Sequence, residues 1–194
     1  MNLILASASP RRREILASLG VSFEMCVADA DESCDILHPG LRVEKIAENK
    51  CSAAVTLLTE QKRLTQDTLV LASDTLVTMD GVFLGKPKDT EDAMRMLCML
   101  QGSSHDVVTG IALWYQGKKV TAHEMTRVSF APMTTAEIER YVATGEPMGK
   151  AGAYAIQGHA ARYITGIAGD YFNVVGLPVR RLYDTLYTSF GIEI

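Results

Sequence analysis

The sequence of 194 residues has no long hydrophobic run, and its longest apolar stretches, such as residues 111–115, are five residues long. A membrane-spanning helix needs about 20 apolar residues, so we expect no membrane partner. No basic residue precedes the short apolar run at residues 3–6, and three arginines follow it, which is the reverse of a secretory signal peptide. The four cysteines form neither a Cys-x-x-Cys pair nor a metal-ligand pattern, so we expect reduced thiols and a cytoplasmic protein.

Aromatic residues are few (7%), and positive charge is not in excess, with 19 Lys and Arg against 23 Asp and Glu. The formal net charge of −4 excludes a broadly basic surface, so we expect no nucleic-acid polymer as a partner. A local basic pocket remains allowed. With 47% hydrophobic and 22% charged residues, the composition is that of a globular protein and not of a disordered one.

Apolar patterns typical of strands and of helices alternate along the chain, with no internal repeat and no linker. The pair Asp80-Gly81 is typical of a hairpin turn, and Thr134 with Glu137 indicates a capping box. We therefore expect one mixed α/β domain over residues 1–194 with long central strands. The expected strands are 3–6, 69–79, 82–84, 106–115, 120–130 and 162–167; the expected helices are 10–19, 41–58, 90–101, one ending near 145 and one after 178; residues 149–158 are expected as loop and strand.

Three arginines, Arg11, Arg12 and Arg13, occupy the first turn of the helix that Ser9 and Pro10 are expected to begin. Positive charge is unfavourable there, because the N-terminus of a helix already carries partial positive charge. The same exposed N–H groups and the guanidinium groups together favour binding of a phosphate anion. Arginines that turn into solvent would cost only on the order of a few tenths of a kcal/mol, so both interpretations stay open.

Lys50 falls in the middle of the apolar stripe of the expected helix 41–58, at 100° per residue. A lysine on that side either extends its ammonium out to solvent or points it into a polar cleft where an anion compensates the charge. Because Lys50 lies far from both helix ends, we favour the cleft. The apolar stripe is formed by Val43, Ile46, Ala47, Ala54 and Leu57.

Asp74 lies within the apolar stretch 69–77, where an ionised carboxylate costs several kcal/mol unless it is paired or coordinated. A turn at this point would leave Asp74 solvated; metal ligation or general-base catalysis would explain its place better. An acidic run precedes the second helix and is typical of a solvated loop, but one of its carboxylates could join Asp74 around a divalent cation. The run contains Asp29, Asp31, Glu32 and Asp35.

Lys86 stands between Gly85 and Pro87 in a stretch that is superficially like a P-loop. The spacing is one residue short, and Pro87 stands where a P-loop needs Ser or Thr, so a P-loop is excluded. The stiff turn could still direct the Lys86 ammonium at a phosphate.

Taken together, these fragments resemble the Maf family of nucleoside triphosphate pyrophosphatases, and they are spread in order over nearly the whole chain. The matching pieces are Leu5-Ala6-Ser7-x-Ser9-Pro10-Arg11-Arg12, Asp31-Glu32, Lys50, Ser73-Asp74-Thr75, Gly85-Lys86-Pro87, Thr109-Gly110, Lys150-Ala151-Gly152-Ala153-Tyr154-Ala155-Ile156-Gln157-Gly158 and Val175-Gly176-Leu177-Pro178.

The resemblance implies an elongated mixed α/β fold, similar to that of inosine triphosphate pyrophosphatases, with two lobes around a central cleft. It also implies hydrolysis of a nucleoside triphosphate to the monophosphate and pyrophosphate, with Mg²⁺ or Mn²⁺ as cofactor. Arg11, Thr75 and Gln157 are similar to the residues of the branch that hydrolyses dTTP and UTP. A homodimer is compatible with the resemblance.

Carried onto this chain, the resemblance assigns a role to each of the unusual polar residues. Thr75 and Gln157 would read the pyrimidine base with help from Arg11. Glu32 and Asp74 would bind the metal, or Asp74 would act as the base on the attacking water, and these two roles stay open. The phosphate chain would be held by Ser7, Arg11, Arg12, Lys50 and Lys86.

Two alternatives remain besides a dTTP and UTP pyrophosphatase. One is an enzyme of the same type with another base preference, for 7-methyl-GTP or an ITP-like nucleotide. The other is a nucleotide-binding regulator of septum formation that releases no pyrophosphate. Carboxylates at Glu32 and Asp74 argue against the regulator, because a pure binder does not need them beside phosphates.

Overall fold

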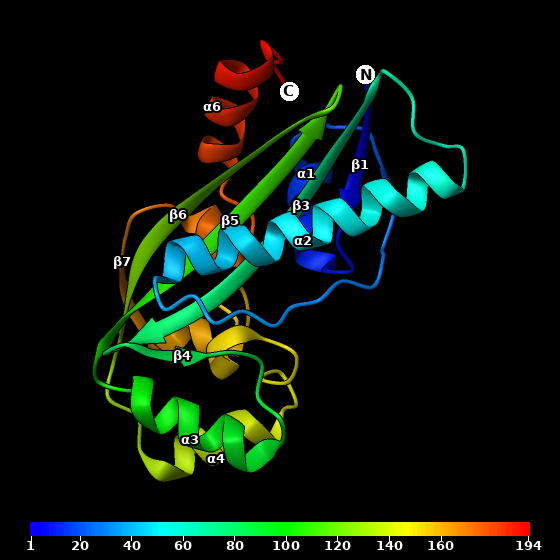
Figure 1. The fold of residues 1–194 in the computed structure, drawn as a ribbon. Helices are drawn as coiled ribbons and strands as arrows, with labels where there is room; N and C mark the ends of the chain where they lie inside the picture. Colours follow the sequence, from blue (N-terminus) through cyan, green and yellow to red (C-terminus); the bar gives the residue numbers. More distant parts are fainter. The chain divides into compact units, whose positions relative to one another are not determined.

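The computed structural model describes residues 1–194 as a mixed α/β chain, which confirms the expected fold class (Figure 1). The strands are β1 (Asn2–Ala6), β2 (Phe23–Met25), β3 (Thr68–Met79), β4 (Val82–Leu84), β5 (Ser104–Tyr115), β6 (Lys118–Phe130) and β7 (Ile164–Ala168). The α-helices are α1 (Pro10–Ser18), α2 (Pro39–Glu60), α3 (Thr90–Leu100), α4 (Thr135–Ala143), α5 (Tyr171–Val175) and α6 (Val179–Phe190), and two 3₁₀ helices, η1 (Ala151–Ala153) and η2 (His159–Tyr163), lie between α4 and β7.

One mixed sheet of seven strands organises the chain, in the order β2-β1-β3-β5-β6-β7, with β4 paired to β3. β1 pairs parallel with both β2 and β3, whereas the β3–β4 and β6–β7 pairs are antiparallel. The hairpin between β3 and β4 turns at Asp80 and Gly81 with φ of 50° and 80°, as the sequence predicts.

The chain divides into two compact units that use alternate parts of the sequence. Unit 1 comprises Met1–Asp74, Thr109–Glu124 and Gly176–Ile194, and unit 2 comprises Thr75–Val108 and Met125–Val175. The single domain over residues 1–194 and the cleft between two lobes stay predictions.

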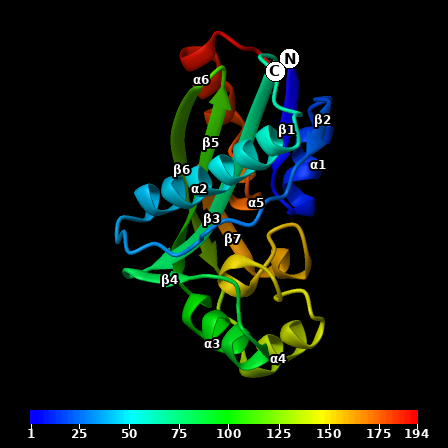
Figure 2. The same ribbon diagram turned by 45° about the vertical axis from the view of Figure 1, so that its right-hand side comes forward.

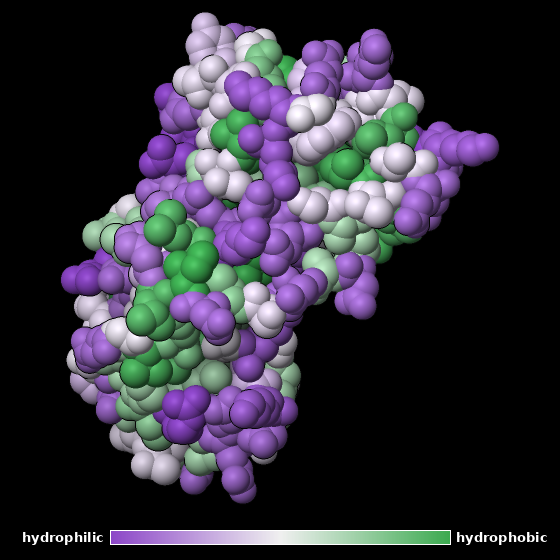
Figure 3. Space-filling model, in the orientation of Figure 1, coloured by the Kyte–Doolittle hydropathy of each residue, from purple (hydrophilic) through white to green (hydrophobic).

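In unit 1, α2 packs across one face of the sheet, as Figures 1 and 2 show. The packed residues are Ile4, Ala6, Ala47, Cys51, Ala54, Leu58, Val70, Ala72 and Ala112, together with Cys26. At Gly110 on β5 the helix comes so close that an added Cβ would lie 2.5 Å from the backbone carbonyl of Val43. The C-terminal end of α2 is hydrophilic, on the right of Figure 3, where Glu60, Lys62 and Arg63 are exposed. Thus α2 buries one side only.

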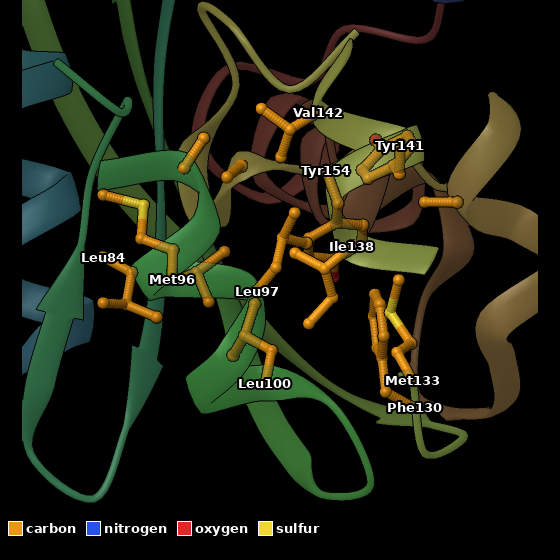
Figure 4. Close-up of a cluster of buried hydrophobic side chains, with 14 of the residues drawn as sticks. Leu84, Met96, Leu97, Leu100, Phe130, Met133, Ile138, Tyr141, Val142 and Tyr154 are labelled. Carbon is orange, nitrogen blue, oxygen red and sulfur yellow. The ribbon is translucent and has the colours of Figure 1, made fainter. Parts of the chain in front are cut away.

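In unit 2, α3 and α4 cover a second core, part of which Figure 4 shows. Leu97 and Leu100 of α3 and Ile138 and Val142 of α4 belong to this core, and all four side chains are buried. Thr134 and Glu137 form the expected capping box at the start of α4. These contacts fix the direction of α4 and of the chain that follows it.

One expected element is absent, and two observed elements, β2 and α5, were not expected. The expected strand within residues 149–158 is wrong, because the segment forms η1 and turns, and Gly152 there has φ of 69°. An added Cβ at Gly152 would come within 2.8 Å of Val77, so only glycine suits the position. β2 and α5 have three and five residues, too few for a periodicity to indicate them.

All four cysteines are free, as expected, and no helix is both long and apolar enough to span a membrane.

His105 of β5 predicts a pH dependence of stability. Its Nε2 shares a 2.8 Å hydrogen bond with the Tyr154 hydroxyl, and its buried Nδ1 has no partner. Burial lowers the pKa of His105 from 6.5 to about 4, and the charge of Asp106 opposes this shift only in part. The unfolded chain therefore binds more protons between these two values, so the free energy of unfolding falls as the pH falls through this window.

We expect a loss of about 2 kcal/mol between pH 7 and pH 4.5 from His105 alone. Urea unfolding of the natural protein and of His105→Phe at both pH values measures it, because the variant should lose less stability on acidification. An equal loss in both proteins would contradict this assignment.

Candidate functional site

The candidate site begins where β1 and β3 run parallel. The register pairs Ala6 with Ala72, so Ser7 and Ser73 are the next residues along the two strands, and Asp74 follows Ser73. β1 ends at Ala6, whereas β3 continues, so polar residues after this pair gather at the carboxyl end of β1. In sheets with parallel strands, this edge is where ligands bind.

Ser7 connects the end of β1 to the first turn of α1. Its buried Oγ accepts hydrogen bonds from the Ser9 N–H at 3.2 Å and from Arg12 Nη1 at 3.1 Å. Ser9 is the N-cap residue of α1 but its side chain makes no capping hydrogen bond. The expected helix start is therefore confirmed, and because the Ser9 side chain does not cap α1, that end of the helix stays suited to an anion.

The Gly176 carbonyl joins this group from the segment before α6. It accepts a hydrogen bond from Arg12 Nε at 2.8 Å and another from Ser73 Oγ at 3.2 Å. Arg12 is thus held at two of its nitrogens, and its guanidinium does not turn into solvent. Sequence reasoning named neither Ser73 nor Gly176 as a site residue, although both lie within matched motifs.

Two arginine cations are partly desolvated here. Burial lowers the pKa of Arg12 to about 10; Asp74 and Glu32 raise it and Arg11 lowers it further. Burial also lowers the pKa of Arg11, with Glu14 opposing. At neutral pH Arg12 stays charged, so an anionic ligand would offset the cost of its burial.

Lys50 of α2 points to two carboxylates. Its Nζ lies 2.7 Å from Asp74 Oδ1 and 3.0 Å from Glu32 Oε1. The Lys50 and Asp74 side chains are only 17% and 15% exposed, whereas Glu32 is 56% exposed. The expectation that Lys50 meets a partner anion, and does not extend into solvent, is confirmed. Asp74 is paired and not solvated. Glu32 is the residue of the acidic run that lies beside it at the Lys50 ammonium.

The carboxylates of Glu32 and Asp74 fit a divalent cation whose remaining ligands come from substrate phosphates and water. Glu32 and Asp74 reach the same ammonium, so their oxygens converge on one point. No group of three or more His, Cys, Asp or Glu side chains is placed to hold a metal. Mg²⁺ is commonly bound by one or two carboxylates together with substrate phosphates and water, which this donor set allows.

The remaining expected residues, Thr75, Lys86 and Gln157, belong to unit 2. Lys86 is exposed just after β4, and the neighbouring Gly85 carbonyl accepts a hydrogen bond from the Gly152 N–H at 3.1 Å. Gln157 is exposed as well. The structure brings Ser7, Arg12, Lys50, Asp74 and Glu32 together within unit 1; that Thr75, Lys86 and Gln157 join them stays a prediction.

The fold and the site define a class: an α/β protein with a half-buried guanidinium at a helix N-terminus beside a pair of carboxylates, suited to a phosphorylated ligand with a divalent cation. The family model described as Maf-like protein matches residues 2–189. The chain therefore belongs to the Maf family, as its motifs predict.

Relatives match along their whole length. A protein from Desulforamulus reducens named dTTP/UTP pyrophosphatase is 49% identical over 99% of this chain and 98% of its own. Proteins of the same name from Pelotomaculum thermopropionicum and Bacillus pumilus are 48% and 42% identical, over 99% and 98% of this chain and 98% and 97% of their own.

Among solved structures, the Staphylococcus aureus Ham1 protein is similar over 68% of this chain and 72% of its own, with a TM-score of 0.45 and 14% identity. The expected likeness to inosine triphosphate pyrophosphatases stays a prediction.

Proposed function

We propose that this protein hydrolyses dTTP and UTP to the monophosphate and pyrophosphate, with Mg²⁺ or Mn²⁺ as cofactor. The observation that carries the proposal is the half-buried Arg12, held at Ser7 and Gly176 within electrostatic reach of Asp74 and Glu32. Relatives that are 42–49% identical over nearly the whole chain and named dTTP/UTP pyrophosphatase support the substrate.

Binding of the triphosphate depends on the residues around α1. Its N–H groups and the Arg12 guanidinium neutralise the negative charge of the phosphate chain, and the Ser7 hydroxyl can donate to a phosphate oxygen. Arg11, half-buried on the same turn, and Lys86 supply further positive charge. Preorganised donors of this kind stabilise the charge that moves onto the departing pyrophosphate.

Hydrolysis adds water across the α–β phosphoanhydride bond. The water oxygen bonds to phosphorus, the bond to the pyrophosphate oxygen breaks, and the water proton passes to a base. Asp74 is proposed as that base or as a metal ligand with Glu32. Mg²⁺ or Mn²⁺, when bound, would neutralise phosphate charge and polarise the phosphoryl group. Lys50 orients the Asp74 carboxylate by its 2.7 Å contact.

Base selection is assigned to Thr75 and Gln157, with Arg11 assisting. The amide of Gln157 offers one donor and one acceptor, which complement the carbonyl and N–H edge of uracil or thymine. Exposure leaves the Gln157 side chain accessible to a ligand.

A nucleotide panel tests the proposal. We expect pyrophosphate release from dTTP and UTP with Mg²⁺ to exceed that from CTP, dATP, GTP, ITP and 7-methyl-GTP by at least about tenfold in kcat/KM. EDTA should abolish turnover, and Mg²⁺ or Mn²⁺ should restore it. Preference for ITP or 7-methyl-GTP would establish the other base preference, and nucleotide binding without pyrophosphate release would establish a regulator; turnover in EDTA would remove the metal role.

A further inference from the structure

Glu146 lies in the turn after α4 and binds the segment that carries Gln157. Its Oε2 accepts a hydrogen bond from the His159 N–H at 2.9 Å, and its Oε1 accepts from the Tyr141 hydroxyl at 2.8 Å and more weakly from the Ala160 N–H at 3.4 Å. Burial would raise the pKa of Glu146, but these hydrogen bonds hold it below its ordinary value of 4.5. The carboxylate is therefore ionised at neutral pH.

Tyr141 holds the beginning of the same segment, at Ala155. Its hydroxyl donates to Glu146 and accepts a hydrogen bond from the Ala155 N–H at 3.3 Å. The two side chains of the α4 region thus hold residue 155 on one side of Gln157 and residues 159–160 on the other.

Between these anchors the chain makes one tight turn. The Gly158 N–H donates to the Ala155 carbonyl at 3.1 Å, which places Ile156 and Gln157 at the two central positions. Ile156 packs against the core of unit 2, whereas Gln157 is exposed. The turn therefore directs the Gln157 side chain outward from a fixed base.

The Glu146 carboxylate packs closely against the glycine of this turn. An added Cβ at Gly158 would lie 2.3 Å from Glu146 Oε2, so the carboxylate occupies the space of the missing side chain. Gly158 has φ of −114°, which any residue adopts, so close approach and not backbone conformation explains this glycine.

We infer that Glu146, assisted by Tyr141, is a positioning residue for base selection: it fixes the turn that presents Gln157 to the pyrimidine. The inference rests on the proposed function and adds to it a residue that touches no phosphate-binding group. A hydrogen-bonding side chain discriminates bases only if its tip is held in place, because an error of about 1 Å can cost a hundredfold.

The experiment measures kcat/KM for UTP and for CTP, whose base differs by an amino group in place of a carbonyl. Glu146→Gln keeps an acceptor for Tyr141 but puts an amide in place of one acceptor oxygen, and Tyr141→Phe removes the bridge while keeping the ring. We expect each to reduce the UTP/CTP ratio about tenfold while the inhibition constant of inorganic pyrophosphate stays unchanged. Glu139→Gln, which alters an exposed carboxylate on α4, is the control.

A double-mutant cycle with Gln157→Ala separates positioning from general support of the fold. If Glu146 acts through Gln157, Gln157→Ala alone lowers the ratio, and adding Glu146→Gln lowers it no further. Additive losses, an unchanged ratio in Glu146→Gln or Gln157→Ala, or equal losses for UTP and CTP would each overturn the inference. The proposed function fails separately, if the natural protein releases no pyrophosphate from dTTP or UTP.

Discussion

Asp74→Asn is expected to reduce pyrophosphate release from dTTP at least about a thousandfold while the fold stays intact. The amide has the shape of the carboxylate and can still accept a hydrogen bond from Lys50, which now lies 2.7 Å from Asp74 Oδ1. It carries no negative charge and takes up no proton, so it serves neither as a general base nor as an effective metal ligand.

The measurement is steady-state pyrophosphate release with saturating Mg²⁺, together with thermal unfolding of the variant. Asp184→Asn in α6 is the control, because Asp184 also forms an ion pair, with Arg180, but lies on an exposed helix face. Turnover by Asp74→Asn within about tenfold of the natural protein would remove Asp74 from the chemistry.

Arg12→Met is expected to lower kcat/KM for dTTP by about a hundredfold or more. Methionine keeps most of the apolar stem but removes the guanidinium charge that would face the phosphates. The two acceptors described above each keep another donor: Ser7 Oγ retains the Ser9 N–H, and the Gly176 carbonyl retains Ser73 Oγ.

Arg13→Met is the matched control, since Arg13 is the next residue of α1 and is exposed. It should leave kcat/KM nearly unchanged and so separate the effect of a half-buried, hydrogen-bonded arginine from that of the general positive charge of this turn. Equal losses in the two variants would mean that only long-range charge matters, and no loss in Arg12→Met would exclude phosphate binding by Arg12.

Local rules were enough for several parts of the molecule. The Asp80-Gly81 turn and the Thr134–Glu137 capping box depend on residues adjacent or nearly adjacent in sequence, and both formed as expected. The position of Lys50 on the apolar side of its helix was sufficient to favour an anionic partner over solvent, because an unpaired ammonium there is costly.

Other features depend on contacts between distant residues and leave no local signal. Ser73 and Gly176 meet although they are 103 residues apart, and nothing near either residue indicates the other. The glycine-rich segment after residue 149 suggested a strand, but the side chains of Val77 and Glu146 determine its turns through the space they occupy beside Gly152 and Gly158. Close contacts of this kind can be recognised only when the positions of both residues are known.

The close approach at Gly110 has a consequence for how mutations far from the chemistry are tolerated. Since any larger residue there would push against the backbone of α2 at Val43, it would displace the helix that carries Lys50 relative to the strand that carries Asp74. Gly110 has no functional group, but its small size allows the close contact between α2 and the sheet on which the Lys50–Asp74 distance depends. A larger residue at position 110 is therefore expected to act on the Lys50–Asp74 pair through this displacement of α2.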